Sequence, residues 1–372
     1  MARAPVSAPS TASVPTARLA DIALHAEVSE ATVSRVLNGR AGVASATRQR
    51  VLAALDMLGY ERPVRLRQRS AGLVGLVIPE LTNPIFPAFA QIIEQALSGY
   101  GYTPVLGTQM PGGATEDELV DQLVERGVTG IVFLSGLHAD TSADPARYAR
   151  LASRGVPFVL INGYNPDIAA PSVSPDDRAA AAIAVRHLAE LGHRRIGLAV
   201  GPARFVPALR KAEGFAATLD ELNALPAPNG PGGQGSYPVR GAVRHTLFTV
   251  EGGEAAAGAL LDEGCTGLVC GSDMMALGAV RAARRRGLEV PREVSVVGYD
   301  DSALNAFTDP PLTTVRQPVR AMANAAVHAL LEETGHGTEV RQAPEVGQLA
   351  RPEFVFQPEL VVRGSTGPAP AG

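Results

Sequence analysis

Short apolar runs alternate with amphipathic stretches from residue 73 onward, and this alternation constrains the fold more than any other feature. Runs of strand length separated by helical stretches are typical of a parallel, doubly wound sheet. The predicted strands are Leu73–Ile78, Thr103–Leu106, Gly130–Leu134, Pro157–Ile161, Arg195–Val200, Thr246–Val250, Gly267–Cys270 and Val294–Gly298. The predicted helices are Ile85–Ser98, Asp117–Arg126, Ala179–Leu191 and Met274–Arg286. The sequence therefore predicts an α/β body.

A break in this pattern indicates how the body is divided. Eight predicted strands, with a Pro- and Ser-containing break near Pro171–Pro175, favour two sheets rather than one. Two such lobes face each other across a cleft at the carboxyl ends of the strands, where small ligands bind. The Pro- and Gly-rich segment Pro226–Gly241 is predicted to be a surface loop. Its Gly230, Gly232 and Gly235 have dinucleotide-motif spacing, but no strand precedes them, so we expect no nucleotide there.

The first part of the chain shows the periodicity of three short helices. The apolar stripes are Leu19, Ile22, Ala23 and Ala26; Val33, Val36 and Leu37; and Val51, Leu55 and Leu58. Ser29 is a suitable N-cap for the second helix, and the short link before it forces the first two helices to cross steeply. Three small helices around one core suit a helix-turn-helix, although a protein-binding module can share this pattern.

Charge separates the head from the body. Residues 1–72 carry ten Arg and five acidic residues, whereas the remaining 300 carry 23 basic and 32 acidic residues. A head of net charge +5 on a body of net charge −9 indicates a polyanionic partner for the head alone. A solvated basic surface would have the same charge, and the residues of the second helix favour DNA.

The chain lacks the residue patterns of the common enzyme classes. It contains no short motif of serine hydrolases, zinc proteases or phosphate-binding loops. The acidic pairs Asp176–Asp177 and Asp300–Asp301 are more typical of helix caps or ligand-hydroxyl contacts than of acid–base catalysis. Cys265 and Cys270 suit neither a disulfide framework nor a zinc site. We therefore expect no enzyme activity, no cofactor and no metal.

The composition of the two termini and the length of the apolar runs predict where in the cell the protein is located. No apolar run reaches the roughly 20 residues that span a bilayer. Residues 1–15 are rich in Ala, Pro, Ser and Thr and lack the apolar block of a signal peptide, so we expect a disordered tail. Residues 365–372 are expected to form a second such tail. These features predict a cytoplasmic protein with no membrane partner.

Several motifs resemble one known family. The head carries them from Arg18 to Asn38 and again at Thr47–Val51 and Leu58–Tyr60. In the body they are Leu191–Gly197, Gly271–Gly278, Val294–Asp301 and Pro310–Gln317. Together they extend over roughly residues 18–363 and resemble the lac/galactose repressor (LacI/GalR) family of transcriptional regulators.

This resemblance implies a small all-α helix-turn-helix head followed by a two-lobed, periplasmic-binding-protein-like body of doubly wound parallel sheets. The implied parts are a DNA-binding domain at residues 16–61, a hinge at 62–72, and an effector-binding and dimerisation domain at 73–364. The implied function is that of a repressor which binds a pseudo-palindromic operator in double-stranded DNA as a homodimer. No Leu heptad follows Val361–Arg363, which favours a dimer over a tetramer built on a coiled coil.

The resemblance also implies which residues contact DNA. Ser29–Asn38 is the implied recognition helix, with Glu30, Ala31 and Arg35 at base-reading positions. Arg presents a fork to guanine, Glu accepts from cytosine, and the Ala methyl suits a thymine methyl. The implied phosphate-contacting residues are Ser29, Thr32, Ser34 and Asn38. Further implied DNA contacts are Arg18, Leu19, Thr47 and Tyr60. The alternative for Thr32 and Ser34 is that they belong to an ordinary solvated helix face and do not contact DNA.

Two positions depart from the family pattern. Glu27 stands where the family usually has Gly in a tight turn, and a left-handed conformation costs a non-Gly residue on the order of 1 kcal/mol. In the hinge, Arg69 takes the place of the family's Leu, which wedges into the minor groove. Arg65 and Arg69 are one helical turn apart, and Leu66 is the nearby Leu. We expect this hinge to bind chiefly by charge, with Leu66 at most a partial wedge.

In the body, the resemblance implies an effector site in the cleft. The matching positions are Phe86, Arg210 or Lys211, Ser272, Asp273 and Asp300. A carboxylate after a strand, as at Asp300, can accept from two ligand hydroxyls. Asp273 is equally suited to cap the helix that follows it.

The effector is expected to be a carbohydrate, and a purine or another metabolite is the alternative. The chain has no Trp, so a sugar ring would stack on Phe or Tyr. The candidates are Phe86, Tyr164, Phe205 and Phe307. Effector binding is expected to reorient the lobes and so alter how a dimer presents its heads. Two other classes of protein are not expected. An extracytoplasmic sugar-binding protein shares the two-lobed body but has no helix-turn-helix head, and an enzyme of this fold would need a cluster of catalytic side chains.

Overall fold

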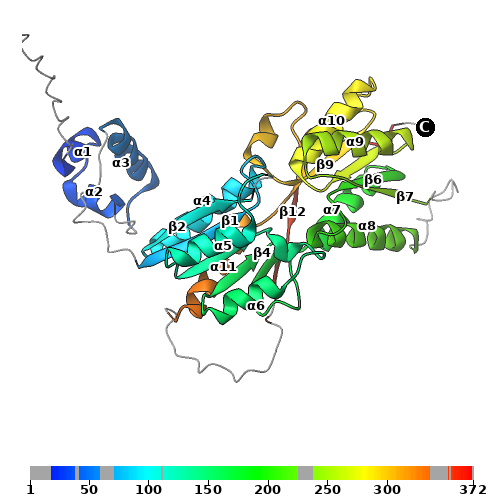
Figure 1. Ribbon diagram of the computed structural model, residues 1–372. Helices are drawn as coiled ribbons and strands as arrows, with labels where there is room; N and C mark the ends of the chain where they lie inside the picture. The colour runs from blue at the N-terminus through cyan, green and yellow to red at the C-terminus, as the bar shows by residue number, and fades with distance from the viewer. Residues whose placement is uncertain are drawn as a thin grey trace, which may run out of the picture. The chain divides into compact units, whose positions relative to one another are not determined.

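The computed structural model describes residues 18–37, 42–58, 71–109, 112–224, 238–335, 351 and 353–370. The chain forms two compact units, Met1–Arg69 and Ser70–Gly372. Figure 1 shows the helical first unit and the larger α/β second unit. The predicted tail at residues 1–15 and most of the predicted hinge lie outside the described residues. None of the helices in the described ranges is long and apolar enough to cross a membrane.

The described residues of the first unit form three helices around one apolar core. They are α1 (Leu19–His25), α2 (Glu30–Leu37) and α3 (Ser45–Met57). The buried core side chains are Ile22, Ala23, Ala26, Val33, Val36, Val51 and Ala54. Each helix contributes part of its apolar stripe, as the spacing of these residues predicts.

In the part of the second unit that the structure describes, two six-stranded sheets each form the centre of a lobe. The order in the first lobe is β11-β5-β4-β3-β1-β2. Its strands are β1 (Gly72–Ile78), β2 (Tyr102–Thr108), β3 (Gly130–Leu134), β4 (Phe158–Ile161), β5 (Ser172–Pro175) and β11 (Glu353–Phe356). All neighbouring strands of this sheet are parallel.

The second lobe has the order β12-β10-β9-β8-β6-β7. Its strands are β6 (Arg195–Val200), β7 (Arg240–His245), β8 (Gly267–Cys270), β9 (Ser295–Asp300), β10 (Thr313–Arg316) and β12 (Glu359–Val361). Strand β12 is antiparallel to β10, and the other neighbours are parallel. The prediction of doubly wound parallel sheets is therefore confirmed.

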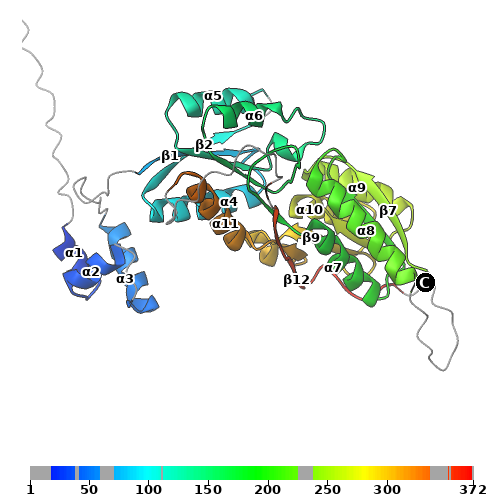
Figure 2. The ribbon, with the colours of Figure 1, turned by 90° about the horizontal axis from the view of Figure 1, so that it is seen from below.

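Helices cover both faces of each sheet (Figure 2). In the first lobe, α4 (Ile85–Gly99) and α11 (Val319–Glu333) pack on one face. The opposite face packs against α5 (Glu116–Glu125) and α6 (Ala146–Ser153). In the second lobe the two helix pairs are α7 (Asp177–Glu190) with α8 (Val206–Ala224), and α9 (Val250–Asp262) with α10 (Asp273–Arg285). In the described ranges, the short 3-10 helices η2 (Leu137–Ala139) and η3 (Ala303–Phe307) lie in loops after strands.

The chain passes between the two lobes three times. It crosses from β5 to α7, returns from β10 to α11, and crosses again from β11 to β12. Short crossing segments of this kind allow two lobes to hinge without unfolding either core.

The structure corrects two predictions about secondary structure. Thr246–Val250 was predicted to be a strand, but the segment is a loop that leads into α9. Thr249 is the N-cap of α9 and accepts a hydrogen bond from the Gly252 N–H at 3.0 Å. The strand of this region is β7, an edge strand whose residues are exposed or half-buried and therefore lack an apolar run. The predicted break at Pro171–Pro175 contains β5, a buried strand formed mainly by small polar residues.

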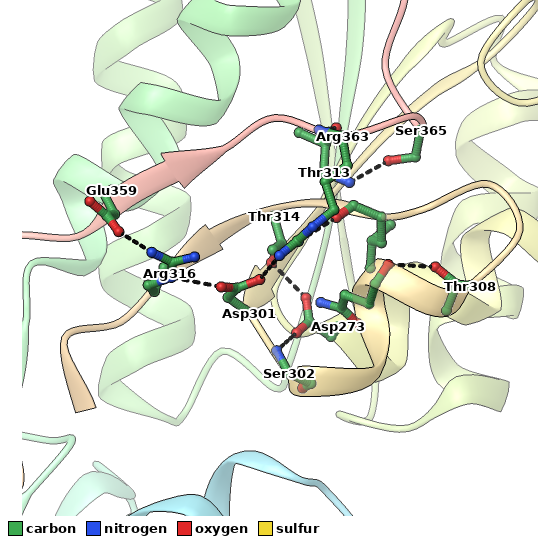
Figure 3. Close-up of polar contacts among 12 residues, drawn as sticks. Asp273, Asp301, Ser302, Thr308, Thr313, Thr314, Arg316, Glu359, Arg363 and Ser365 are labelled. Carbon is green, nitrogen blue, oxygen red and sulfur yellow. Dashed lines mark hydrogen bonds and ion pairs between the residues drawn. The ribbon is translucent and has the colours of Figure 1, made fainter. Parts of the chain in front are cut away.

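The predicted C-terminal tail is also corrected, because its described residues pack on the second lobe. Ser365 is fully buried. Its Oγ donates to the carbonyl oxygen of Val296 at 2.6 Å. The same Oγ accepts from the N–H of Thr313 at 2.8 Å (Figure 3). The N–H of Ala369 donates to the Leu191 carbonyl at 2.8 Å. Composition alone suggested disorder, but polar groups of this segment find partners on β9, on β10 and at the end of α7.

Candidate functional site

A cavity of about 170 Å³ lies between the lobes at the carboxyl ends of the strands. The first lobe contributes Pro79, Glu80, Asn83, Ile85, Phe86, Phe89, Leu134, Ser135, Ala139 and Asn162. The second lobe and the crossing segment contribute Phe205, Pro207, Lys211, Phe248, Gly271, Ser272, Tyr299, Asp300 and Gln317. The position agrees with the cleft expected for two doubly wound lobes.

Strained turns at three strand ends line the cavity. Ser135 after β3, Asn162 after β4 and Asp300 at the end of β9 have φ values of 48°, 64° and 116°. Such values are costly for residues with a side chain and persist where the surrounding structure fixes them. The Asn162 Nδ2 donates to the Ser135 Oγ at 2.6 Å, which links the first two turns. Each strand therefore ends in a polar residue at the cavity wall.

Asp300 is the buried carboxylate of the cavity. Its Oδ1 accepts from the Nε2 of Gln317 at 2.6 Å, while the Oε1 of Gln317 has no hydrogen-bond partner among the described residues. Burial raises the pKa of Asp300 well above its usual range, and the nearby Asp273 raises it further. The site thus presents the Gln317 Oε1 and, once Asp300 is ionised, its carboxylate oxygens as acceptors for ligand hydroxyl groups.

The next residue, Asp301, fixes the turn that carries Asp300. Its carboxylate accepts from Arg316 on β10 and from Arg363 after β12, both at 2.6 Å (Figure 3). Arg316 also pairs with Glu359 on β12. These ion pairs hold the end of β9 against its neighbour β10 and against the segment that follows β12.

Lys211 lies at the wall of the cavity in a buried cluster. Its ammonium donates to Asp177 at the start of α7 and lies 3.8 Å from the ring centre of Tyr299. The Tyr299 hydroxyl also donates to the Asp177 carboxylate, at 3.3 Å. Burial raises the pKa of Asp177, which the charge of Lys211 opposes. Burial and the adjacent carboxylates raise the pKa of Tyr299 well above its usual range, so its hydroxyl stays protonated.

Two predicted effector residues do not line the cavity. Arg210 forms a bidentate ion pair with Glu353 of β11, at 2.5 and 2.9 Å, so that its guanidinium joins the two lobes instead. Asp273 accepts from the Ser302 N–H at 2.8 Å and from the Thr314 Oγ1 at 2.6 Å (Figure 3). The N-cap of α10 is Ser272 rather than Asp273. Asp273 therefore braces the loop after β9.

Phe86 and Phe205 line the cavity, whereas Tyr164 and Phe307 do not. Phe307 is 85% exposed, so its ring is not covered by the cavity wall. Phe248 was not among the predicted cavity residues, because Thr246–Val250, which contains it, was expected to be a strand. A reading of Thr249 as an N-cap would have placed Phe248 in a loop after a strand, where ligands bind.

A buried polar group supports the η2 segment beside the cavity. Glu116 accepts from the Tyr148 hydroxyl at 2.6 Å and from the N–H of Leu137 at 2.8 Å. The Nε2 of His138 donates to the Ile161 carbonyl at 3.1 Å. Desolvation lowers the pKa of His138 to about 4, although Glu116 opposes this shift. His138 is therefore neutral at physiological pH.

The described groups include no cluster of three or more His, Cys, Asp or Glu side chains that could hold a metal ion. Burial raises the pKa of Cys265 to about 11 and raises that of Cys270 as well. Thiols of this kind are not reactive nucleophiles.

In the head, α2 presents an exposed polar face. Glu30, Ala31 and Arg35 are exposed, and Ala31 and Arg35 are one helical turn apart. The Oγ of Ser29 accepts from the Thr32 N–H at 3.3 Å, which agrees with its predicted role as N-cap. Glu27 has a φ of 54°, the left-handed conformation expected where the family has Gly.

The other predicted DNA contacts are only partly described. Arg18 precedes α1, and Leu19 begins it. Thr32 and Ser34 are half-buried on α2, and Thr47 is half-buried on α3. Asn38, Tyr60, Arg65, Leu66 and Arg69 lie outside the described residues.

Comparisons with known proteins identify the family. The model described as bacterial regulatory proteins, lacI family, matches residues 18–62, and that of a periplasmic binding protein-like domain matches 185–366. The chain is 63% identical over 355 residues to the HTH-type transcriptional regulator MalR of Streptomyces coelicolor, covering 95% of this chain and 98% of that one. The chain belongs to the LacI family. This LacI-family protein is a DNA-binding transcriptional regulator with a ligand-binding body, and it is not an enzyme.

Solved structures of similar proteins agree with this assignment. The cellobiose complex of the transcriptional regulator CelR matches with a TM-score of 0.64 and 29% identity, covering 94% of this LacI-family chain and 99% of that chain. The lac repressor dimer bound to operator and an anti-inducer matches with a TM-score of 0.63 and 26% identity, covering 95% and 100%.

Proposed function

We propose that the protein is a repressor that binds a pseudo-palindromic operator as a homodimer and releases or engages it in response to a small effector. One head carries one recognition helix, which reads a half-site, so a two-fold operator calls for two chains. The similar lac repressor structure is a dimer on its operator. A body with its own two-lobed core is suited to hold two heads together.

The observation that supports DNA reading is the exposed face of α2. Arg35 offers a planar fork for guanine O6 and N7, Glu30 can accept from cytosine, and Ala31 suits a thymine methyl. We assign phosphate contacts to Ser29, Thr32 and Ser34, and further DNA contacts of unspecified type to Arg18, Leu19 and Thr47. The phosphate contacts fix the position of the head along the DNA, and the three exposed residues of α2 determine which base sequence it prefers.

Selection of bound sequences from a random duplex pool tests this assignment. The wild-type chain should enrich two half-sites related by symmetry, and Arg35→Ala should cost roughly 1–3 kcal/mol and relax preference at one G·C pair per half-site. Arg50 on α3 is exposed and lies 3.8 Å from the Glu27 carboxylate, and Arg50→Ala, which removes the same charge as Arg35→Ala, is the matched control. It should weaken binding to all sequences alike. Enrichment of asymmetric single sites, or no enrichment, contradicts the proposal.

We propose a carbohydrate as the effector. The cavity places the carboxylate of Asp300 and the free oxygen of Gln317 beside the rings of Phe86, Phe205 and Phe248. A sugar offers hydroxyl donors at its edge and an apolar face of C–H groups, so this pairing of acceptors and aromatic rings suits it. The similar CelR structure contains cellobiose.

Calorimetric titration of the full chain tests the effector class. We expect a saturable heat with at least one of cellobiose, maltose and ribose, and none with adenosine or guanine. Phe248→Ala removes one wall of the cavity and should abolish the heat of any sugar that binds. Binding of a purine in place of all sugars would assign the site to the alternative effector class.

The proposed response is a shift in the population of lobe arrangements. A ligand in the cavity contacts both lobes, and the three crossing segments permit the lobes to rotate against each other. An effector that binds one arrangement more tightly changes the affinity for operator by the same coupling free energy.

A further inference from the structure

The two lobes touch at the rim of the cavity, where η2 meets the loop before α8. The Thr141 N–H and its Oγ1 both donate to the carbonyl oxygen of Arg204 at 2.8 Å. The Arg204 Nε donates to the Asp140 Oδ2, also at 2.8 Å. Asp140 and Phe205 form an isolated antiparallel bridge. We call this group of contacts the rim clasp: Asp140, Thr141, Arg204 and Phe205.

The Asp140 carboxylate is held in position from its own lobe. Its Oδ1 accepts from the N–H and the Oγ of Ser142, at 2.9 and 2.6 Å. Burial acts to raise the pKa of Asp140, but the hydrogen bonds from Ser142 and the guanidinium of Arg204 outweigh it and lower the pKa. The carboxylate is therefore ionised at neutral pH and already aimed at the other lobe.

The rim clasp is continuous with the cavity wall. Ala139 and Phe205 line the cavity, and each is adjacent in sequence to a charged residue of the clasp. The Arg204 guanidinium lies 4.7 Å from the centre of the Phe205 ring. The ion pair therefore holds an aromatic wall residue in place while it joins the lobes.

The strength of the clasp suits a contact that opens and closes. The Arg204 side chain is 53% exposed, whereas that of Asp140 is 10% exposed. Water and salt weaken an ion pair with one exposed partner, so such pairs contribute little to overall stability. The contact is nevertheless charge-assisted and directional, which favours one lobe arrangement over another.

We propose that the rim clasp is a gate which controls access to the cavity, and that the Asp140–Arg204 ion pair is the part that keeps it shut. This inference deepens the proposed function, since it regulates the same cavity. The experiments that test the gate use no effector and no DNA. The gate proposal can therefore be refuted while the effector proposal stands, and the effector proposal can be refuted while the gate proposal stands.

A single Trp in the cavity provides the first measurement. The chain has no Trp, so Phe86→Trp introduces one fluorophore on a wall residue that is not part of the clasp. Acrylamide, a small neutral quencher, reports how often the cavity opens. In this background, Arg204→Gln and Asp140→Asn should each raise the quenching constant by about threefold or more, because each removes the ion pair.

The matched control is Arg154→Gln. Arg154 pairs with Asp121 at 2.7 Å, both side chains are partly exposed, and both belong to the first lobe. This variant removes an ion pair of the same type without touching the rim, and it should leave quenching unchanged. An equal rise in the control and the clasp variants would mean general loosening and would overturn the gate.

Hydrogen exchange of the full chain, measured with Phe86 unchanged, gives an independent second readout. The Thr141 amide donates across the lobes, so its exchange reports clasp opening. Arg204→Gln should speed exchange in peptides that contain Thr141 by about tenfold and leave peptides from β3 unchanged. Unchanged exchange at Thr141 in both clasp variants would refute the proposal even if the Trp variant failed to fold.

Discussion

The ammonium of Lys211 and the carboxylate of Asp177 form a buried ion pair at the wall of the cavity, with side chains 6% and 2% exposed. The pair joins α8 to the start of α7 and lies against the Tyr299 ring. Burial of both charges makes the pair sensitive to the loss of either partner, because the remaining charge is left without water.

Lys211→Met should therefore lower the free energy of unfolding by about 3 kcal/mol, since it leaves Asp177 buried without its ammonium. The double variant Lys211→Met with Asp177→Asn should regain a substantial part of this loss, because no charge then remains. Denaturant unfolding of the three chains measures both effects. Arg178→Ala, which breaks the exposed pair with Glu213, is the control and should cost less than about 1 kcal/mol. A Lys211→Met effect as small as that of the control would contradict the argument.

Asp300→Asn should weaken binding of any sugar that the wild-type chain binds by about tenfold or more, since a hydrogen bond to a charged group contributes about 1.5–3 kcal/mol. The affinity for DNA without effector should stay the same. Asp309→Asn changes an exposed carboxylate after η3 and is the control. A lower melting temperature with unchanged sugar affinity would show that Asp300 only braces its loop.

Sugar binding should also release protons at Asp300. Burial raises the pKa of its carboxyl group, and ligand hydroxyls that donate to the carboxylate favour the ionised form. Binding therefore lowers this pKa, and affinity should rise with pH as the group ionises. Calorimetry in buffers of different ionisation enthalpy measures the released protons. Uptake of protons on binding would contradict this sign, and Asp300→Asn should abolish the release.

Gly201→Ala should shrink the cavity. A Cβ at Gly201 would lie 2.0 Å from the Phe248 ring, so the ring has to move. Overpacking of this kind costs about 1–3 kcal/mol, and sugar affinity should fall by about tenfold because the displaced ring enters the ligand's space. Gly99→Ala, at the end of α4, meets nothing within 4 Å and should leave binding unchanged. Equal affinities of the two variants would place Phe248 outside the ligand contact.

His138→Gln should flatten the pH dependence of stability. The pKa of His138 is lowered to about 4 in the folded chain, below its usual 6.5, because desolvation disfavours the charged form. The folded state is then fully stable above pH 6.5 and loses about 3 kcal/mol as pH falls toward 4, since the unfolded state binds the proton first.

The measurement is the free energy of unfolding at several pH values between 7 and 4. Gln retains a side-chain donor for the Ile161 carbonyl but does not titrate. The slope should decrease without vanishing, because desolvation also lowers the pKa of His187 and His193. An unchanged slope would show that His138 titrates normally.

Local patterns in the sequence determine the head and most of the body. The bounds of β3, β6 and β8 agree with the predicted strands, because buried central strands of parallel sheets are continuous apolar runs. The N-cap at Ser29 was predictable because it depends on residues within one turn of chain, whereas the left-handed turn at Glu27 was expected from the family resemblance.

Other features depend on contacts between distant segments, and only the tertiary structure decided them. Strand β7 is an edge strand without an apolar run, so its position cannot be read from local hydrophobicity. Arg210 was a candidate ligand contact until Glu353, 143 residues away, proved to be its partner. A guanidinium, a carboxylate or an amide has the same chemistry in every sequence. Whether it faces a ligand, another lobe or its own loop is set by which strand ends the fold brings together.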